Sequence, residues 1–303
     1  MILQTFNLSK RFGNRWAVKN LNLSVEKGQI FGFLGPNGAG KSTTIRMLLN
    51  LIRPTNGSFE LLSKNVKNHG QKIYSNIGAL VEKPDFYLYL SAEKNLRILG
   101  ALGGDIPPDR IKEVLEIVKL ADRAKDKVRN FSHGMNQRLG IAQALLSYPE
   151  LIILDEPTSG LDPQGIKEVR DLIVTLAQEQ EITVFLSSHQ LHEIEQTCTH
   201  MAIIDNGALV VQGGVEELLR ETDFYVTEVI VDQPERACDL LKLERWIRKV
   251  SIAENVVKVQ IAAKERPQLT EFLVRNHFAV YSVVPRTSLE DYYLSLLKTK
   301  EAE

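Results

Sequence analysis

The segment IFGFLGPNGAGKST, residues 30–43, indicates the fold more strongly than any other part of the chain. It opens with an apolar run of strand length, and helical periodicity follows from Lys41 to about Leu51. GPNGAGKST, residues 35–43, matches the pattern G-x-x-x-x-G-K-[ST]. Glycines let the backbone wrap so that successive N–H groups face phosphate oxygens, and the following helix adds the partial positive charge of its N-terminus. The stretch therefore predicts a strand, a phosphate-binding loop and a helix.

The loop supplies a set of candidate nucleotide-binding residues. Lys41 is expected to neutralise the β and γ phosphates, and the Ser42 hydroxyl is expected to ligate Mg²⁺. A glycine-rich loop that only turns the chain is the alternative, and the position between a strand and a helix argues against it. The candidate residues are Gly35, Pro36, Asn37, Gly38, Ala39, Gly40, Lys41, Ser42 and Thr43.

Two carboxylates follow a second apolar strand, LIIL at residues 151–154. Ligands of parallel sheets bind at the carboxyl edge, where these acids would lie. Asp155 is expected to hold Mg²⁺, and Glu156 to orient or deprotonate the attacking water. A solvated strand end is the alternative, but a phosphate loop 114 residues upstream (155 minus 41) favours the catalytic interpretation.

His189 follows a third apolar strand, residues 182–187, at the same predicted sheet edge. This position makes it a candidate for sensing the γ-phosphate. The alternative is an ordinary core or surface histidine, which is the usual role of a single histidine.

Short apolar runs alternate with helical patterns, which predicts an α/β fold with buried, largely parallel strands. Residues 95–144 have helical periodicity throughout and predict a helical subdomain inserted in the sheet domain. Asn206-Gly207 between two apolar runs predicts a β-hairpin.

After about Glu221 the pattern changes to strand, helix, strand, strand, helix, strand, with one more helix at the end. This order predicts a small appendage with a split-βαβ, ferredoxin-like arrangement. The predicted elements are residues 225–231, 234–243, 246–253, 256–261, 266–276, 278–284 and 289–297.

Composition limits the possible functions. Lys and Arg total 37 against 38 Asp and Glu in 303 residues, and no basic stripe interrupts this balance, so we expect no nucleic-acid partner. Two unclustered cysteines, Cys198 and Cys238, favour a reducing cytosol. The N-terminus lacks the apolar stretch of a secretory signal, and no apolar run reaches membrane-spanning length. A role at a membrane would therefore require docking to a partner.

Taken together, residues 1–220 resemble the nucleotide-binding domain of ATP-binding-cassette (ABC) transporters. FSHGMNQR, residues 131–138, is similar to the family signature loop, normally Leu-Ser-Gly-Gly-Gln, and SGLD, residues 159–162, resembles the loop that crosses the dimer interface. The resemblance implies a P-loop NTPase cassette of α/β class, with a mixed sheet core, an antiparallel β part and a helical subdomain over about residues 90–145. Residues 221–303 would form the small α+β C-terminal domain.

The resemblance also implies an ATPase that uses ATP and Mg²⁺ in a head-to-tail dimer with a second copy of itself. Ser132 and the backbone N–H of Gly134, at the start of a helix beginning near Met135, would contact the γ-phosphate on the second cassette. Asp162 belongs to the loop that crosses the interface. Phe12 resembles the aromatic that stacks on adenine, with a buried core phenylalanine as the alternative.

Three residues depart from the family pattern. His133 and Met135 stand where Gly and Gln are usual, which puts the conformation of the signature loop in doubt. Glu82 replaces the usual Gln; its carboxylate can ligate Mg²⁺ or position water, but only as an acceptor. Glu82 followed by KPDFY, residues 83–87, is similar to the same stretch in cassettes that protect bacteria against bacitracin and lantibiotics, and the C-terminal appendage also fits that subgroup. A neutral variant is the alternative.

Residues 82–95 are expected to line the groove that receives a cytoplasmic helix of an integral membrane permease, at the inner face of the membrane. Packing inside the helical subdomain is the alternative for their side chains. The candidate anchors are Pro84, Phe86, Tyr87, Leu88, Tyr89 and Leu90.

Two other functions compete with transport. Translation-type ABC proteins usually carry two cassettes and repair-type proteins a long coiled coil, and this chain has neither feature. A cassette that binds ATP without hydrolysis is disfavoured by Lys41, Asp155, Glu156 and His189. Importers and exporters share all these motifs, so the direction of transport stays open.

Overall fold

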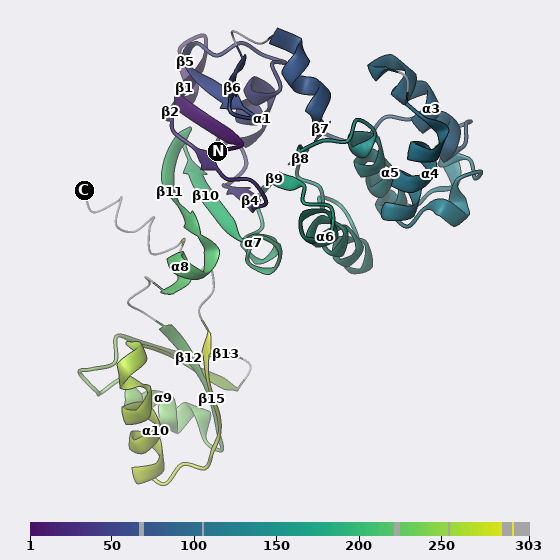
Figure 1. Cartoon of the computed structure of the whole chain (residues 1–303). Helices are drawn as coiled ribbons and strands as arrows, with labels where there is room; N and C mark the ends of the chain where they lie inside the picture. The colour runs from purple at the N-terminus through teal and green to yellow at the C-terminus, as the bar shows by residue number, and fades with distance from the viewer. Residues whose placement is uncertain (67–69, 105, 221–224, 254, 287–292, 294–303) are drawn as a thin grey trace. The chain divides into compact units, whose positions relative to one another are not determined.

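The computed structural model divides the chain into two compact units, Met1–Val215 and Glu216–Glu303. Figure 1 shows the elements of both units along the chain. The structure describes all residues except 67–69, 105, 221–224, 254, 287–292 and 294–303. Each unit has its own hydrophobic core.

A six-stranded sheet forms the centre of the first unit, in the order β11-β10-β4-β9-β8-β7. All neighbours pair in parallel except β10 and β11. The buried, largely parallel strands predicted from the apolar runs are thus confirmed. The strands are β4 (Ile30–Leu34), β7 (Ile77–Leu80), β8 (Leu151–Asp155), β9 (Thr183–Ser188), β10 (His200–Asp205) and β11 (Ala208–Gly214).

The register of this sheet brings three loops to one edge. Asp155 at the end of β8 pairs with Ser187 on β9, and Leu34 at the end of β4 pairs with Ser188. Because parallel strands end at the same edge, the phosphate loop, the two acids and His189 follow one another across neighbouring strands. The predicted convergence on a common edge is therefore confirmed.

Helices α1 (Lys41–Leu48), α6 (Pro163–Gln178) and α7 (Leu191–Thr197) follow β4, β8 and β9 along the chain. The predicted helix to about Leu51 is too long, because Asn50 adopts the left-handed region with φ of 56° and ends the helical path. The predicted hairpin at Asn206-Gly207 is confirmed, since it joins the antiparallel pair β10 and β11.

An antiparallel sheet precedes and adjoins this core. Its order is β2-β1-β5-β6, with β3 paired to β1. The apolar runs of the sequence predicted no strand before residue 30, because exposed polar residues interrupt the apolar residues of β1 and β2. The strands are β1 (Leu3–Phe12), β2 (Arg15–Leu21), β3 (Ser24–Val25), β5 (Asn56–Leu61) and β6 (Lys64–Asn65), and the short helix η1 (Gly70–Asn76) follows.

The helical subdomain lies between β7 and β8 in the chain. It contains α3 (Ala92–Gly103), α4 (Pro108–Ile117), η2 (Ala121–Arg123), η3 (Val128–Asn130) and α5 (His133–Leu145). Helix α5 begins at His133 and not near Met135 as predicted, because the Ser132 hydroxyl caps it by accepting a hydrogen bond from the Met135 amide at 3.2 Å.

The second unit has a four-stranded antiparallel sheet in the order β13-β14-β12-β15. With helices after the first and third strands, this is the split-βαβ order of a ferredoxin-like fold. Helix α8 (Val215–Arg220) precedes it. The elements are β12 (Tyr225–Val231), α9 (Pro234–Leu241), β13 (Lys249–Ala253), β14 (Val256–Ile261), η4 (Ala263–Glu265), α10 (Arg266–Arg275) and β15 (Val280–Arg286).

Several predicted boundaries in this unit were wrong by a few residues. Helix α9 ends at Leu241, two residues early. Strand β13 begins at Lys249 rather than at Trp246, whose ring instead packs edge-on against Phe272 at 6.3 Å between centroids. Strand β15 begins and ends two residues later than predicted. The last predicted helix falls outside the described residues.

Candidate active site

The phosphate loop has a conformation that requires glycine. Gly38 and Gly40 have φ of 82° and 111°, and a Cβ on Gly40 would lie 2.6 Å from the carbonyl oxygen of Ala17. Helix α1 begins without a side-chain cap and has no acidic residue in its first turn. Its first N–H groups are therefore available to an anion, which fits the triphosphate of a nucleotide.

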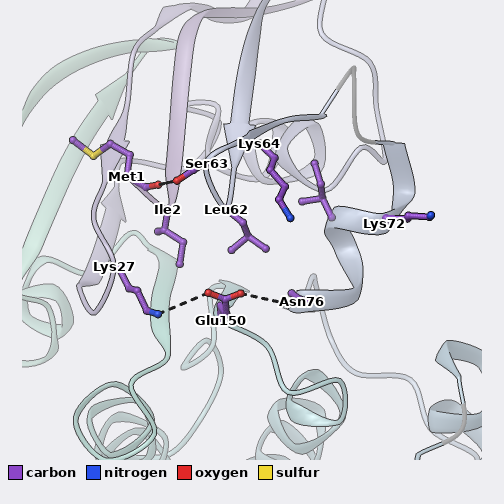
Figure 2. Close-up of a pocket in the computed structure, with 10 residues that line it drawn as sticks. Met1, Ile2, Lys27, Leu62, Ser63, Lys64, Lys72, Asn76 and Glu150 are labelled. Atoms are coloured by element: carbon purple, nitrogen blue, oxygen red, sulfur yellow. Dashed lines mark hydrogen bonds and ion pairs between the residues drawn. The ribbon is translucent and has the colours of Figure 1, made fainter.

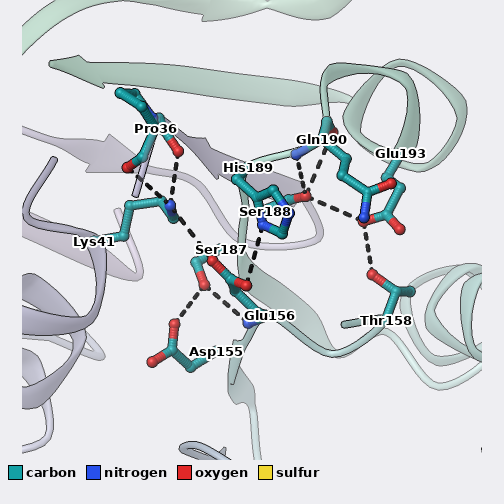
Figure 3. Close-up of polar contacts among 11 residues, drawn as sticks. Pro36, Lys41, Asp155, Glu156, Thr158, Ser187, Ser188, His189, Gln190 and Glu193 are labelled. Atoms are coloured by element: carbon teal, nitrogen blue, oxygen red, sulfur yellow. Dashed lines mark hydrogen bonds and ion pairs between the residues drawn. The ribbon is translucent and has the colours of Figure 1, made fainter. Parts of the chain in front are cut away.

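Lys41 is buried, with 5% of its surface exposed. Its Nζ donates to the carbonyl oxygens of Gly35 at 2.7 Å and Pro36 at 3.3 Å, and lies 3.4 Å from Oε1 of Glu156 (Figure 3). A buried ammonium needs such partners, since an unpaired one is costly. Carbonyl oxygens and one carboxylate hold the positive charge at the mouth of the loop.

Ser187 joins the two acids that end β8. Its Oγ donates to Oδ1 of Asp155 at 2.6 Å and accepts a hydrogen bond from the Glu156 amide at 2.9 Å. Glu156 has a positive φ of 49°, so the chain turns sharply after Asp155. Ser187 was not among the site residues predicted from the sequence. Its role could have been predicted from its hydroxyl at the end of an apolar strand, two residues before His189.

Glu156 lies between two nitrogen groups. One carboxylate oxygen faces Lys41, and the other, Oε2, lies 3.1 Å from Nδ1 of His189. Figure 3 shows the three side chains pointing toward one another, Lys41 from the start of α1 and Glu156 and His189 from the residues that directly follow β8 and β9. A carboxylate held in this way can accept a proton from a water molecule, and a histidine protonated on both ring nitrogens can donate from Nδ1 to the carboxylate and from Nε2 to a phosphate oxygen.

The described residues fit a magnesium ion only together with a nucleotide. No group of three or more His, Cys, Asp or Glu side chains gathers as a metal site in the part of the chain that the structure describes. Asp155 and Ser42 offer a carboxylate and a hydroxyl, which suit a hard cation, and phosphate oxygens would complete the ligand set. Lys41 and the free N–H groups of α1 would hold those phosphates.

Glu82 and Phe12 lie at the margins. The carboxylate of Glu82 pairs with Arg46, which lies one helical turn beyond Ser42 on α1. The structure therefore shows no contact between Glu82 and the expected magnesium ligand Asp155 among the described residues. Phe12 ends β1 with 53% of its surface exposed and Nζ of Lys10 at 5.1 Å from its ring centroid. The alternative of a buried core phenylalanine was wrong.

Ser132 and Asp162 cap helices of their own chain. Asp162 accepts from the Gly165 amide at 2.9 Å at the start of α6, as Ser132 does for α5. The two loops lie near each other, because a Cβ on Gly160 would be 3.6 Å from Nε2 of His133. The structure thus places the signature loop beside the loop after the catalytic acids within one chain.

The predicted permease anchors divide into two groups. Phe86 is buried, with 7% exposure, whereas Tyr87, Leu88 and Tyr89 are 50%, 57% and 66% exposed. For Phe86 the alternative of interior packing therefore holds, because its ring is buried. The rings of Tyr87 and Tyr89 lie 6.0 Å apart on the surface.

A separate cavity of about 340 Å³ lies at the other edge of the central sheet (Figure 2). Asn76 and Glu150, which precede β7 and β8, both line it. Glu150 lies 3.8 Å from Nζ of Lys27 and accepts from Asn76 at 3.4 Å. Since it opens at the amino ends of the strands, this cavity is not part of the nucleotide site.

Strand order, phosphate loop and paired acids together define a P-loop nucleotide-binding protein of the α/β class. A family model described as ABC transporter matches residues 18–159. The chain is 43% identical over 298 residues to the bacitracin transport ATP-binding protein BcrA of Bacillus licheniformis, covering 98% of this chain and 97% of BcrA. BcrA of Enterococcus faecalis is 35% identical over 98% of this chain and 96% of its own length.

Among solved structures, CbiO1 of Clostridium perfringens, part of the ABC transporter complex CbiONQ, matches with a TM-score of 0.67 and 26% identity. The match covers 73% of this chain and 91% of CbiO1. The chain therefore belongs to the ABC transporter ATP-binding protein family. Within the described residues, no helix is long and apolar enough to cross a membrane.

Proposed function

We propose that this chain hydrolyses Mg-ATP and so drives export of a peptide antibiotic or similar amphiphile through a separate membrane permease. The observation that carries the proposal is the position of Glu156, whose two carboxylate oxygens lie 3.4 Å from Lys41 and 3.1 Å from His189. A general base must lie close to the phosphates, with a carboxylate oxygen that can reach the attacking water.

The chemistry follows from the side chains. Lys41 leaves its carbonyl partners to neutralise phosphate oxygens. Glu156 orients the attacking water and accepts its proton, while His189 donates to the γ-phosphate and holds the carboxylate in position. When bound, Mg²⁺ supplies charge neutralisation at the phosphates. Asp155, fixed by Ser187, and Ser42 would hold the ion.

A second copy of the chain would complete the site. Ser132 and the Gly134 amide lie at the N-terminus of α5, which has no acidic residue in its first turn. Such an end favours an anion. In a head-to-tail dimer it would face the γ-phosphate on the other cassette, with Asp162 and its loop at the interface and Phe12 against adenine.

Exposed residues beside the helical subdomain support docking to a permease at the cytoplasmic face of the membrane. An open groove of about 430 Å³ is lined by Leu51, Leu80, Lys83, Pro84 and Leu99, among others. Tyr87, Leu88 and Tyr89 are exposed in the segment that follows. Aromatic residues beside an apolar groove are typical anchors of protein interfaces.

The substrate class rests on the relatives. Two of them are named as bacitracin transport ATP-binding proteins and align over nearly all of this chain, including the appendage. Glu82 in place of Gln, with its carboxylate near α1, would help to hold Mg²⁺ or water once it leaves Arg46.

The test of hydrolysis compares the purified protein with Glu156→Gln. Gln keeps the shape but cannot accept a proton as a base, so we expect turnover to fall by about 10²-fold or more, while Mg-ATP binding persists and an ATP-bound dimer accumulates. Equal inactivity of both proteins would favour a cassette that binds ATP without hydrolysis.

Coupling and substrate need the permease. We expect Tyr87→Glu to abolish co-purification with the permease and leave nucleotide binding unchanged, with the buried-site control Phe86→Leu retaining co-purification. Cells that express this chain together with the permease should tolerate bacitracin better than cells that express the Glu156→Gln variant together with the permease. Equal sensitivity of the two strains would contradict the substrate assignment without affecting the ATPase proposal.

A further inference from the structure

Glu193, on α7, contacts both loops of the catalytic site without touching the catalytic side chains. Its Oε2 accepts a hydrogen bond from the hydroxyl of Thr158 at 2.6 Å and another from the hydroxyl of Ser188 at 3.1 Å. Figure 3 shows this second network beside the one formed by Lys41, Glu156 and His189.

The two donors stand next to the residues that react. Thr158 is two residues after Glu156, and Ser188 directly precedes His189. Both are nearly inaccessible, with 7% and 3% of their surfaces exposed. One carboxylate oxygen therefore connects the loop that carries the general base to the loop that carries the histidine.

Helix α7 holds Glu193 firmly. Ile194, the next residue, is fully buried and lies so near β4 that a Cβ on Gly32 would be 2.7 Å from its Cδ1. The Ser188 hydroxyl also accepts from the Gln190 amide at 2.9 Å, which fixes the turn into α7. The position of the Glu193 carboxylate is thus set by the central sheet.

Its second oxygen indicates that this carboxylate is kept at a cost. Oε1 is buried and has no hydrogen-bond partner among the residues that the structure describes. A buried oxygen without a partner is less stable than a hydrated one. The charge is also sensed nearby, since burial and then the Glu193 carboxylate raise the pKa of the Cys198 thiol. Local rules are broken in this way mainly at functional sites.

We infer that Glu193 is a positioning residue for ATP hydrolysis, which sets the separation of Glu156 and His189 by holding Thr158 and Ser188 on one oxygen. This inference rests on the proposed ATPase activity. Because misplacement of a catalytic group by about 1 Å can cost 10²-fold in rate, loss of the link should lower turnover and leave nucleotide binding intact.

The experiment measures kcat, KM and Mg-ATP affinity of the full chain and its variants. We expect Glu193→Ala to lower kcat by about 10- to 100-fold, with KM and Mg-ATP affinity within about twofold of the parent. Glu193→Gln keeps a carbonyl oxygen that can accept from both hydroxyls, so it should restore most of the turnover. His192→Ala, an exposed change on the same helix, is the matched control and should leave kcat unchanged.

A mutant cycle separates the link from a general effect on stability. Thr158→Val should lower kcat in the parent but have no further effect when combined with Glu193→Ala, since the contact that it removes is already lost. Urea denaturation of each variant reports that the fold is intact. If Glu193→Ala fails to fold, the Thr158→Val, Ser188→Ala double variant replaces it.

The outcomes are distinct. A parent without ATPase activity would overturn the proposed function. With an active parent, unchanged kcat in Glu193→Ala would overturn the inference, as would additive losses in the cycle or a loss in Glu193→Gln as large as in Glu193→Ala.

Discussion

At the scale of the residue, the hydroxyl of Ser187 makes two hydrogen bonds to the residues that end β8 and follow it. It donates to the Asp155 carboxylate and satisfies the amide of Glu156, whose φ of 49° is uncommon for a residue with a side chain. The strained turn that places Glu156 beside Lys41 and His189 therefore depends on a side chain from the neighbouring strand.

Ser187→Ala should destabilise the first unit and weaken the site. It leaves the part-buried Glu156 amide without its partner, which costs about 1–3 kcal/mol. Urea denaturation measures the loss, and Ser187→Thr, which keeps a hydroxyl, should recover part of it. Equal stability of parent and alanine variant would show that the contact is dispensable.

Tyr74 should make the free energy of unfolding decrease at alkaline pH. Burial raises the pKa of its phenol to about 12, and its hydroxyl donates to the Leu48 carbonyl at 3.0 Å. The folded state thus holds this proton more tightly than the unfolded chain, whose tyrosine pKa is about 10. Stability from Tyr74 is complete below about pH 10 and is lost as the pH rises from about 10 to 12.

We expect Tyr74→Phe to lose less stability than the parent over that pH window, measured by urea denaturation at successive pH values. Tyr89→Phe is the control, because that ring is 66% exposed in the same unit. Parallel curves for Tyr74→Phe and the parent would contradict the assignment.

At the scale of the element, the β10–β11 hairpin supports the phosphate loop. The Gly207 amide donates to the Ala39 carbonyl at 2.9 Å, and the Gly207 carbonyl accepts from the Lys19 amide at 2.7 Å. Gly207 has φ of 79°, and a Cβ there would lie 2.7 Å from the carbonyl oxygen of Ala17. The hairpin turn at Gly207, which is remote in sequence, thus stabilises the phosphate loop through a backbone hydrogen bond to Ala39.

Gly207→Ala should lower stability by about 1–3 kcal/mol, through strain and the close approach to Ala17, and weaken Mg-ATP binding because Ala39 moves. Gly13→Ala is the matched control: φ there is 54°, but no atom lies within 4 Å of the added Cβ. Calorimetry of nucleotide binding and unfolding distinguishes them, and equal effects would mean that φ alone matters.

At the scale of the molecule, each unit has a core of its own and one buried cysteine, Cys198 in the first and Cys238 in the second. Since the thiolate is the reactive form, burial protects both thiols while their unit is folded. The two cysteines therefore report on the two units separately.

Leu269→Ala removes a fully buried side chain from the core of the second unit and should destabilise that unit by about 2–5 kcal/mol. We expect faster labelling of Cys238 by a thiol reagent, with Cys198 protected and Mg-ATP affinity unchanged. Val274→Ala, at a 57% exposed position on the same helix, is the control. Simultaneous labelling of both thiols would show that the units unfold as one.

Much of the first unit could be predicted because its signals are local. The strand, glycine loop and helix of residues 30–43 lie within one segment, and apolar runs of strand length mark β8 and β9. The antiparallel strands β1 and β2 escaped this reasoning, since they are half-exposed and take their stability from pairing with β5 and with each other.

From local pattern alone, the candidate site could be predicted as a phosphate loop, an acid pair and a histidine, each at the end of an apolar strand. Periodicity and glycine positions are properties of neighbouring residues, so they can be read without a fold. Only the tertiary structure decided that Ser187 joins the acids, that Glu193 links Thr158 to Ser188 and that Glu82 pairs with Arg46. Such contacts depend on sheet register and helix packing, which bring together residues up to 36 positions apart through the energetics of the whole core.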